Sequence, residues 1–229
     1  MAFIAWAWDA FDFFSAALVI PLLSQTFGRS ILDITLGLTL VLMFRSLGAV
    51  IFGIAADRFG RKWPFVVNNI LLIVIELATG FCQTYEQFLA CRALFGVAMG
   101  GLYGNTAATA LEDCPKASRG IISGILQSGY PFGYLLATAF TQALVTTTRP
   151  EWRSLFWFGA CPPLLIIIFR LFLPETDAYK ERFALRNQTQ SIRSVVAEVK
   201  DAIKRYWLLL IYLILLMAGL TFIVSQSVL

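Results

Sequence analysis

Ionisable side chains lie inside long apolar stretches of the sequence, and these residues are the best equipped to do chemistry there. Asp9 and Asp12 fall in the first stretch, Arg45 in the second, Glu76 in the third and Arg92 in the fourth. A charge at membrane depth costs about 2.5–3.5 kcal/mol on insertion scales, so such residues usually face a cavity or an opposite charge. The pattern therefore predicts ion binding inside a helical bundle.

The two signs of charge predict two different roles. A carboxyl group can take up and release a proton, so Asp9, Asp12 and Glu76 are candidates for proton coupling. The guanidinium group presents a fixed fork of donors that matches a carboxylate, so Arg45 and Arg92 are candidates for binding an organic anion. The alternative is a salt bridge inside the bundle, such as Asp12 with Arg45, without any contact to a substrate.

Neutral and sulfur-containing side chains add less. Asn105 and Gln127 are hydrogen-bonding residues in apolar stretches and are further candidates for substrate binding. There is no histidine, and the four cysteines form no CxxC pair, so no metal site and no cofactor are predicted. Cys82 and Cys91 flank one short loop and could form a bridge. No nucleophile–base arrangement or nucleotide-binding loop indicates an enzyme.

The elements that position these residues are long apolar helices. Hydrophobic residues make up 59% of the 229 residues and charged residues only 14%, well below the roughly 25% charged of a soluble domain. A bilayer core needs about 20 apolar helical residues per crossing. The sequence predicts an all-α membrane protein with spans at 3–27, 34–56, 63–82, 88–110, 120–144 and 154–173, and the start of a seventh at 207–229.

The basic residues predict the orientation of these spans. The net charge is +4, but the excess lies in loops between apolar stretches, so we interpret it as a topology signal and predict no nucleic-acid partner. Cytosolic loops of membrane proteins carry an excess of Lys and Arg. With a cytosolic N-terminus, the outer loops hold only Arg29, Arg149 and Arg153. The inner loops then hold all the other loop cations: Arg58, Arg61, Lys62, Lys116, Arg119, Lys180, Arg182, Arg186, Arg193, Lys200, Lys204 and Arg205.

The domain organisation follows from one long polar connection. Residues 1–173 form a six-helix bundle, 174–206 a cytosolic linker, and 207–229 a seventh membrane segment that reaches the last residue. Within the linker, apolar residues recur at the spacing of an amphipathic helix. They are Ile192, Val195, Val196, Val199, Ile203 and Tyr206. We expect this helix to lie along the cytosolic membrane face.

A charged loop joins the second and third predicted spans. Residues 53–62 read Gly-Ile-Ala-Ala-Asp-Arg-Phe-Gly-Arg-Lys, a GxxxDRxGRK motif on the predicted inner side. A topological anchor would explain its cations, but it would not explain the aspartate and the glycines. We interpret the loop as a gating element, with Gly53 permitting close helix packing and Gly60 a tight turn. Its candidate residues are Gly53, Asp57, Arg58, Gly60, Arg61 and Lys62.

Small residues in the fourth span predict close helix packing. Arg92, Gly96, Gly100 and Gly104 follow one another at four-residue spacing, which places them along one ridge of a helix. Glycines on such a ridge let a neighbouring helix approach closely. The fifth span carries two similar glycine pairs, 120/124 and 129/133, and Pro131 predicts a kink there.

The loop motif and its position between the second and third spans resemble the signature loop of the major facilitator superfamily. The glycine ridge of the fourth span and the sequence Pro174-Glu175-Thr176 after the sixth are similar to the same superfamily. Further stretches, at residues 6–14, 40–53 and 124–137, resemble the fungal plasma-membrane carboxylate permeases, which are lactate and pyruvate proton symporters. The resemblance to bacterial sialic-acid and aromatic-acid transporters is weaker.

This resemblance implies the N-terminal half of a two-bundle transporter that moves a small organic anion and a proton across the plasma membrane by alternating access. The permeases carry an Asn-x-x-Ser/Thr-His-x-Ser/Thr-Gln-Asp motif in the seventh span, whereas residues 219–229 contain neither histidine nor aspartate. The C-terminal half-bundle is then missing, and two alternatives stay open. One is a truncated half-transporter without transport activity, and the other is a transporter of sugars or of aromatic or sialic acids.

Overall fold

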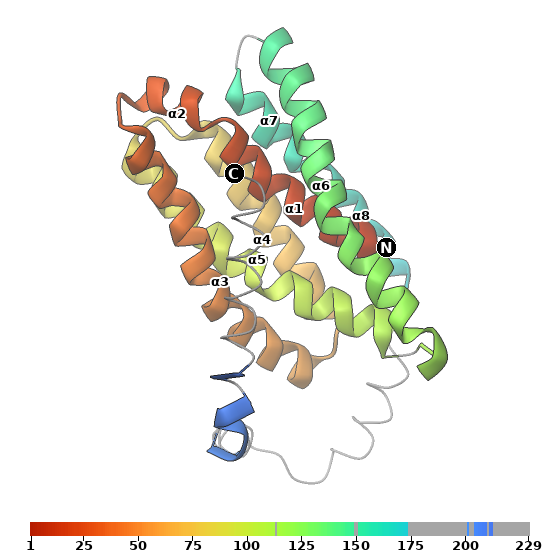
Figure 1. Cartoon of the computed structure of the whole chain (residues 1–229). Helices are drawn as coiled ribbons and strands as arrows, with labels where there is room; N and C mark the ends of the chain where they lie inside the picture. Colours follow the sequence, from red (N-terminus) through yellow and green to blue (C-terminus); the bar gives the residue numbers. More distant parts are fainter. Residues whose placement is uncertain (113, 149–150, 174–200, 202–203, 210, 213–229) are drawn as a thin grey trace. The chain divides into compact units, whose positions relative to one another are not determined.

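A computed structural model describes residues 1–112, 114–148, 151–173, 201, 204–209 and 211–212 of the chain (Figure 1). The chain divides into two compact units, 1–180 and 181–229, and each is described by itself. The second unit shows helix at residues 204–209. The predicted amphipathic helix and the seventh membrane segment therefore fall almost entirely outside the described residues.

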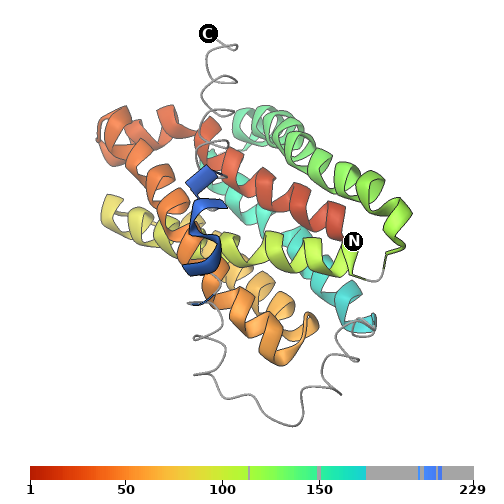
Figure 2. The same ribbon diagram turned by 60° about the horizontal axis from the view of Figure 1, so that its bottom comes forward.

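The first unit is a bundle of helices. Its elements in chain order are α1 (Ala2–Leu18), α2 (Ile20–Phe27), α3 (Ile31–Phe59), α4 (Lys62–Phe81), α5 (Tyr85–Leu111), the short 3-10 helix η1 (Lys116–Ser118), α6 (Arg119–Thr147), α7 (Trp152–Gly159) and α8 (Cys161–Phe172). Both views show α1 lying between α5 and α6, with α3 on the other side of α5 (Figures 1 and 2). Helix α4 packs against α5, α7 and α8.

Local signals explain where the helices begin and end. The Ser30 hydroxyl accepts from the backbone N–H of Asp33, whose carboxylate accepts from the Ser30 backbone, so a capping box starts α3. Thr84 and Gln87 form the same motif at the start of α5. Gly28 ends α2 in the left-handed conformation, which glycine adopts without steric cost.

The predicted spans at 34–56, 63–82, 88–110 and 120–144 each correspond to one helix, and the observed helices mostly extend a few residues beyond the predicted bounds. The prediction of one continuous helix over 3–27 is wrong, because the chain breaks at Val19 and bends by 53° between α1 and α2. The last span is also divided, between α7 and α8.

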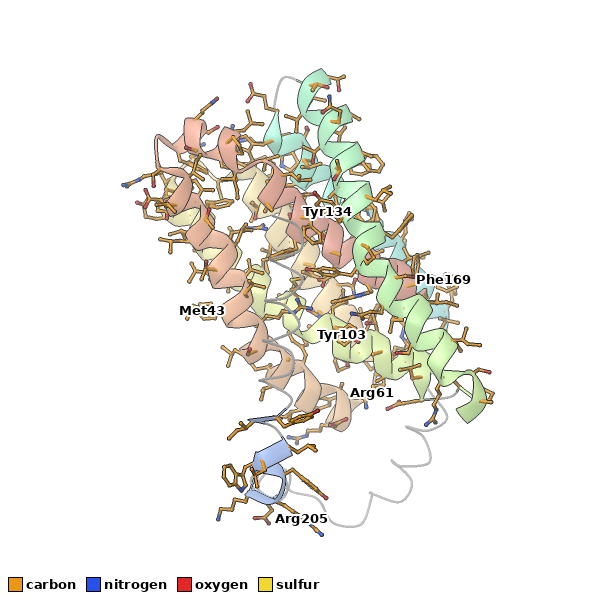
Figure 3. The ribbon with its side chains drawn as sticks, viewed as in Figure 1. Met43, Arg61, Tyr103, Tyr134, Phe169 and Arg205 are labelled. Atoms are coloured by element: carbon orange, nitrogen blue, oxygen red, sulfur yellow. The ribbon has the colours of Figure 1, made fainter. Side chains whose placement is uncertain are left out.

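Hydropathy separates the helices into two groups. Among the described residues, α3, α4 and the segment Trp152–Phe172 are long and apolar enough to cross a membrane, and the bent pair α1–α2 adds a fourth candidate. Helices α5 and α6 are long enough to cross a membrane, with 27 and 29 residues, but they are rich in glycine and hydroxyl side chains. Side chains such as Met43 and Phe169 point away from the bundle, as expected of a surface that meets lipid (Figure 3).

Glycines bring two helix pairs into close contact. A Cβ atom on Gly96 or Gly100 of α5 would overlap the α3 backbone, and one on Gly48 of α3 would overlap the backbone of Val97. Gly133 of α6 lies against the α1 backbone in the same way. These contacts confirm close packing for part of the predicted ridge.

Other glycines do not pack as predicted. A Cβ atom on Gly53, Gly104, Gly120 or Gly124 would meet no atom within 4 Å among the described residues. The expectation that Gly53 and Gly104 permit close helix contacts is therefore wrong within this bundle. Both residues instead line a cavity beside α3 and α5.

Candidate functional site

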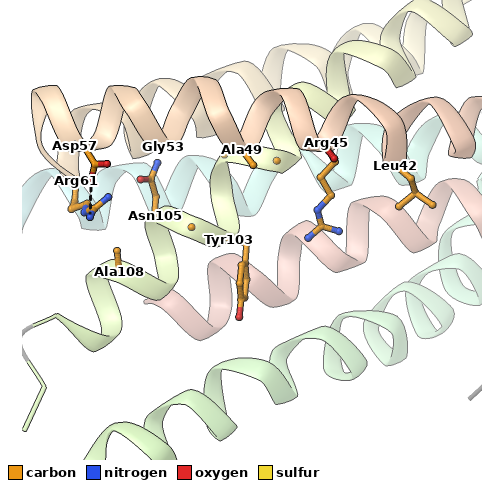
Figure 4. A pocket seen from close by; sticks show the side chains of 13 residues that line it. Leu42, Arg45, Ala49, Gly53, Asp57, Arg61, Tyr103, Asn105 and Ala108 are labelled. Atoms are coloured by element: carbon orange, nitrogen blue, oxygen red, sulfur yellow. Dashed lines mark ion pairs between the residues drawn. The ribbon is translucent and has the colours of Figure 1, made fainter. Parts of the chain in front are cut away.

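The candidate site is a cavity of about 550 Å³ formed by α3 and α5. One wall extends along α3 from Leu42 and Arg45 to Asp57, and continues to Arg61 at the start of α4 (Figure 4). The opposite wall is the glycine-rich part of α5, which has few side chains to fill the space. A cavity of this size falls within the usual range for small-molecule sites.

Arg45 is the cation of the central part of this cavity. Its guanidinium carbon lies 5.4 Å from the centre of the Trp6 ring, and the side chain points into the cavity (Figure 4). No carboxylate among the described residues forms an ion pair with Arg45. The structure therefore does not support the predicted alternative of an Asp12–Arg45 salt bridge, and it leaves the guanidinium donors facing the cavity.

A cluster of aromatic rings packs around the Trp6 ring that Arg45 contacts. The Trp6 ring lies 4.5 Å from the Tyr103 ring and 5.5 Å from the Tyr130 ring, measured between centroids. Trp6 is buried, and Tyr103 lines the cavity. Trp6 and Tyr103 are not among the predicted site residues, because aromatic residues in apolar helices are equally typical of lipid contacts.

Asn105 and Gln127 lie in different surroundings. Asn105 lines the cavity, is 2% exposed, and its amide nitrogen has no hydrogen-bond partner among the described residues. Gln127 is exposed on α6, and its Oε1 accepts a long hydrogen bond of 3.5 Å from the Tyr103 hydroxyl. The structure thus brings Asn105 to the cavity and connects Gln127 to it through Tyr103.

Arg92 lies outside the cavity, in the packed interior. Its guanidinium group forms an ion pair with Glu76 at 3.3 Å and donates to the Thr79 hydroxyl at 2.7 Å. The rings of Phe88, Phe95 and Phe156 surround the guanidinium carbon at 4.7–5.8 Å. Since Arg92 is fully buried and paired, a substrate in the described cavity does not reach it.

The two aspartates of α1 are buried as well. Asp9 and Asp12 are each 2% exposed. Both carboxylate oxygens of Asp9, and Oδ1 of Asp12, lack a hydrogen-bond partner among the described residues. Asp12 lies against Gly159 of α7, where a Cβ atom would press on its Oδ1. Carboxylates without donors are costly to keep charged in a low-dielectric interior.

The charged loop after α3 connects three helix ends. Arg61 pairs with Asp57 at 3.2 Å and with Glu112 at the end of α5 at 2.8 Å. Lys62 donates to the backbone oxygens of Leu171 and Leu173 at the end of α8, at 2.8 and 3.1 Å. Terminal carbonyls of a helix have no partner within that helix, so a cation there is favourable.

Two further loop residues shape this junction. Gly60 has a φ of 92°, a value that favours glycine, which explains its place in the turn. Arg58 lies over the Phe59 ring at 5.3 Å. Glu112 is not among the predicted site residues. A usable signal was present, because Glu112 ends a predicted span on the same side of the membrane as the basic loop.

Comparison with known proteins identifies the family. Residues 21–206 match the family described as sugar (and other) transporter. A carboxylic acid transporter protein homolog from Saccharomyces cerevisiae is 36% identical over 99% of this chain and 39% of its own length. A probable 4-methylmuconolactone transporter from Cupriavidus pinatubonensis is 30% identical over 83% of this chain and 45% of its own length. The chain thus spans less than half the length of these relatives.

Solved structures agree on the fold. The xylose transporter XylE from E. coli in a partially occluded inward-open conformation matches with a TM-score of 0.73 at 16% identity. The match covers 82% of this chain and 50% of that one. XylE is described as a major facilitator superfamily proton:xylose symporter in a second matching structure, with a TM-score of 0.69. The chain belongs to the sugar (and other) transporter family, and its helices have the fold of an N-terminal half-bundle of the major facilitator superfamily.

Proposed function

We propose that this chain forms the N-terminal half of a secondary transporter that carries short monocarboxylates such as lactate and pyruvate together with protons. The observation that carries the proposal is Arg45, a cation in the cavity without an ion-pair partner among the described residues. Its fork of donors matches a carboxylate. The yeast relative named as a carboxylic acid transporter homolog supports the same substrate class.

Each predicted residue receives a role in this proposal. Arg45 and Asn105 bind the anion, with Gln127 acting through Tyr103. Asp9, Asp12 and Glu76 are the candidate proton carriers, because binding a proton removes a buried charge. Arg92 holds Glu76 and so acts as a positioning residue rather than as a contact for the anion.

The loop from Gly53 to Lys62 serves as the gate in this proposal. Its ion pairs join the ends of α3, α4 and α5, so their breaking and forming could accompany the alternation between open states. We further propose a plasma-membrane location with a cytosolic N-terminus, which places the loop on the cytosolic side.

The proposal is tested by reconstituting the purified chain in liposomes that are alkaline inside. We expect the chain to bind labelled lactate. When a second bundle completes the cavity, we expect labelled lactate to accumulate under the proton gradient and to leak out when a protonophore collapses the gradient. Arg45→Gln should lower acid binding by about 10–100-fold, since a hydrogen bond to a charged group contributes about 1.5–3 kcal/mol. Arg29→Gln is the matched control, because Arg29 lies outside the cavity in an exposed ion pair.

The alternatives give different results in the same assay. Competition by xylose but not by pyruvate would favour a sugar substrate, which the sugar porter neighbours make the second candidate. Acid binding without accumulation, even when a second bundle is present, would indicate a truncated half-transporter without transport activity. Wild-type binding by Arg45→Gln would contradict the proposed anion site.

A further inference from the structure

Two thiols meet where α4 turns into α5, at the helix ends remote from the gating loop. Cys82 follows the last residue of α4, and Cys91 lies in the second turn of α5. The Cys82 thiol donates to the sulfur of Cys91, with 3.7 Å between the two sulfur atoms. Both are free cysteines; Cys82 is buried and Cys91 is partly exposed. The proposed transport mechanism uses neither of them.

The backbone around this pair is held in place by several contacts. The Gln87 side chain accepts from the backbone N–H groups of Gln83 and Thr84, at 3.0 and 3.3 Å. The Arg153 guanidinium group donates to the carbonyl oxygen of Cys82 at 3.1 Å. A disulfide needs about 2.0 Å between sulfur atoms, so the two sulfurs, now 3.7 Å apart, have to move closer for a bond to form at this turn.

The other two cysteines provide an internal comparison. Cys114 contacts the carbonyl oxygen of Pro115, and Cys161 contacts that of Trp157. Within the described residues, neither has a second sulfur atom at hydrogen-bond distance. The arrangement of two facing thiols is therefore specific to the α4–α5 turn.

We propose that Cys82 and Cys91 are a modification site, a dithiol that a low-molecular-weight disulfide such as glutathione disulfide converts into an intramolecular disulfide bond. Cys91, the more exposed thiol, gives its proton to solvent and attacks one glutathione sulfur, which expels one glutathione thiolate. Cys82 then loses its proton and attacks the Cys91 sulfur, which expels the second. Two protein thiols are oxidised, the glutathione disulfide is reduced, and the two protons complete the glutathione thiols.

The bond would act on the helix pair that carries the buried charges. Arg92 follows Cys91 directly and binds Glu76 and Thr79 on α4. A Cys82–Cys91 bond would tie the end of α4 to α5 next to this ion pair. Because a cross-link removes conformations from the unfolded chain, the oxidised protein should melt at a higher temperature than the reduced one.

The test is peptide mass spectrometry on the whole purified chain. The reduced protein is incubated in detergent with glutathione disulfide, the remaining thiols are blocked with N-ethylmaleimide, and the chain is cut with trypsin. Both cysteines fall in the same tryptic peptide, 63–92. We expect this peptide to appear without label and lacking two hydrogen atoms, while Cys114 and Cys161 carry maleimide or glutathione.

Variants separate the proposed pair from general oxidation. Cys82→Ser should leave Cys91 as a glutathione adduct and abolish the increase in melting temperature, whereas Cys161→Ser should keep both the bond and the increase. A wild-type peptide that carries two maleimide or two glutathione groups after oxidation would overturn the proposal. A bond that forms only in urea-unfolded protein would overturn it too, because the folded turn would then not favour it.

Discussion

Arg92 and Glu76 form an ion pair that is almost completely removed from solvent, with side-chain exposures of 0% and 1%. Removing one partner of such a pair leaves an uncompensated charge in an apolar interior, which costs about 3–5 kcal/mol. We therefore expect Arg92→Met to lower the melting temperature of the detergent-solubilised chain strongly. The double variant Arg92→Met with Glu76→Leu should recover most of the loss, because it removes both charges.

The exposed ion pair of Arg29 and Glu86 is the control for this experiment. The two side chains are 50% and 73% exposed, and their charged groups lie 3.7 Å apart. Exposed pairs contribute about 0–1 kcal/mol, so Arg29→Met should change the melting temperature little. If the double variant were no more stable than Arg92→Met alone, the loss in Arg92→Met would not come from the uncompensated charge of Glu76.

The sequence identified the buried ionisable residues but not their partners. A charge within an apolar run is visible from composition alone, and Asp9, Asp12, Glu76 and Arg92 are all buried in the structure. Their pairing depends on how each helix rotates about its axis and which neighbour it faces. The sequence therefore also allows an Asp12–Arg45 pair, whereas the buried ion pair in the structure joins Glu76 and Arg92.

At the scale of helices, the contact between α3 and α5 depends on glycine. A Cβ atom on Gly100 would overlap the carbonyl oxygen of Arg45. Gly100→Ala should therefore push the two helices apart, destabilise the bundle and displace Arg45 from its place over Trp6. A lower melting temperature and weaker lactate binding would be measured together, since the same helix carries Arg45.

Gly124→Ala on α6 is the matched control, because a Cβ atom there would meet nothing within 4 Å. Alanine is favoured over glycine in a helix by about 0.8–1.0 kcal/mol, so this variant should melt at the same or a slightly higher temperature. Equal melting temperatures for Gly100→Ala and the wild type would contradict the close contact between α3 and α5.

Helix positions were largely predictable, and helix breaks were not. The capping boxes at Ser30 and Thr84 place the starts of α3 and α5 close to the predicted spans. The breaks at Val19 and Ala160 interrupt runs that stay apolar, so hydropathy does not reveal them. Prolines near the start of α2 and α8 were the available signal, because proline favours the first turn of a helix.

At the scale of the whole molecule, the described helices form an N-terminal half-bundle of the major facilitator fold. The chain covers 39% of the yeast relative and 50% of the partially occluded XylE structure. In the proposed transporter, the cavity formed by α3 and α5 would be one wall of the substrate site. Substrate specificity in that site would depend on residues from both bundles, so a half-bundle predicts the chemistry of one wall alone.

The orientation of this half-bundle in the membrane is a prediction that labelling can test. Cys114 lies just after α5, near the end of the helix whose Glu112 pairs with the gating loop. Arg29 lies in the turn between α2 and α3, at the opposite end of α3 from that loop. With a cytosolic N-terminus, Cys114 faces the cytosol and Arg29 faces outward.

Two single-cysteine variants make the comparison. One keeps Cys114 and replaces the other three cysteines with serine, and the second replaces all four and adds Arg29→Cys. A membrane-impermeant maleimide should label Arg29→Cys in intact cells and Cys114 only in inside-out vesicles. The reverse pattern would place the basic loops outside, against the positive-inside bias, and would remove the gating loop from the cytosolic side. The helices α3, α4 and α5 lie between Arg29 and Cys114, so we expect three membrane crossings between the two positions. Labelling of both sites from one side would contradict this odd number of crossings.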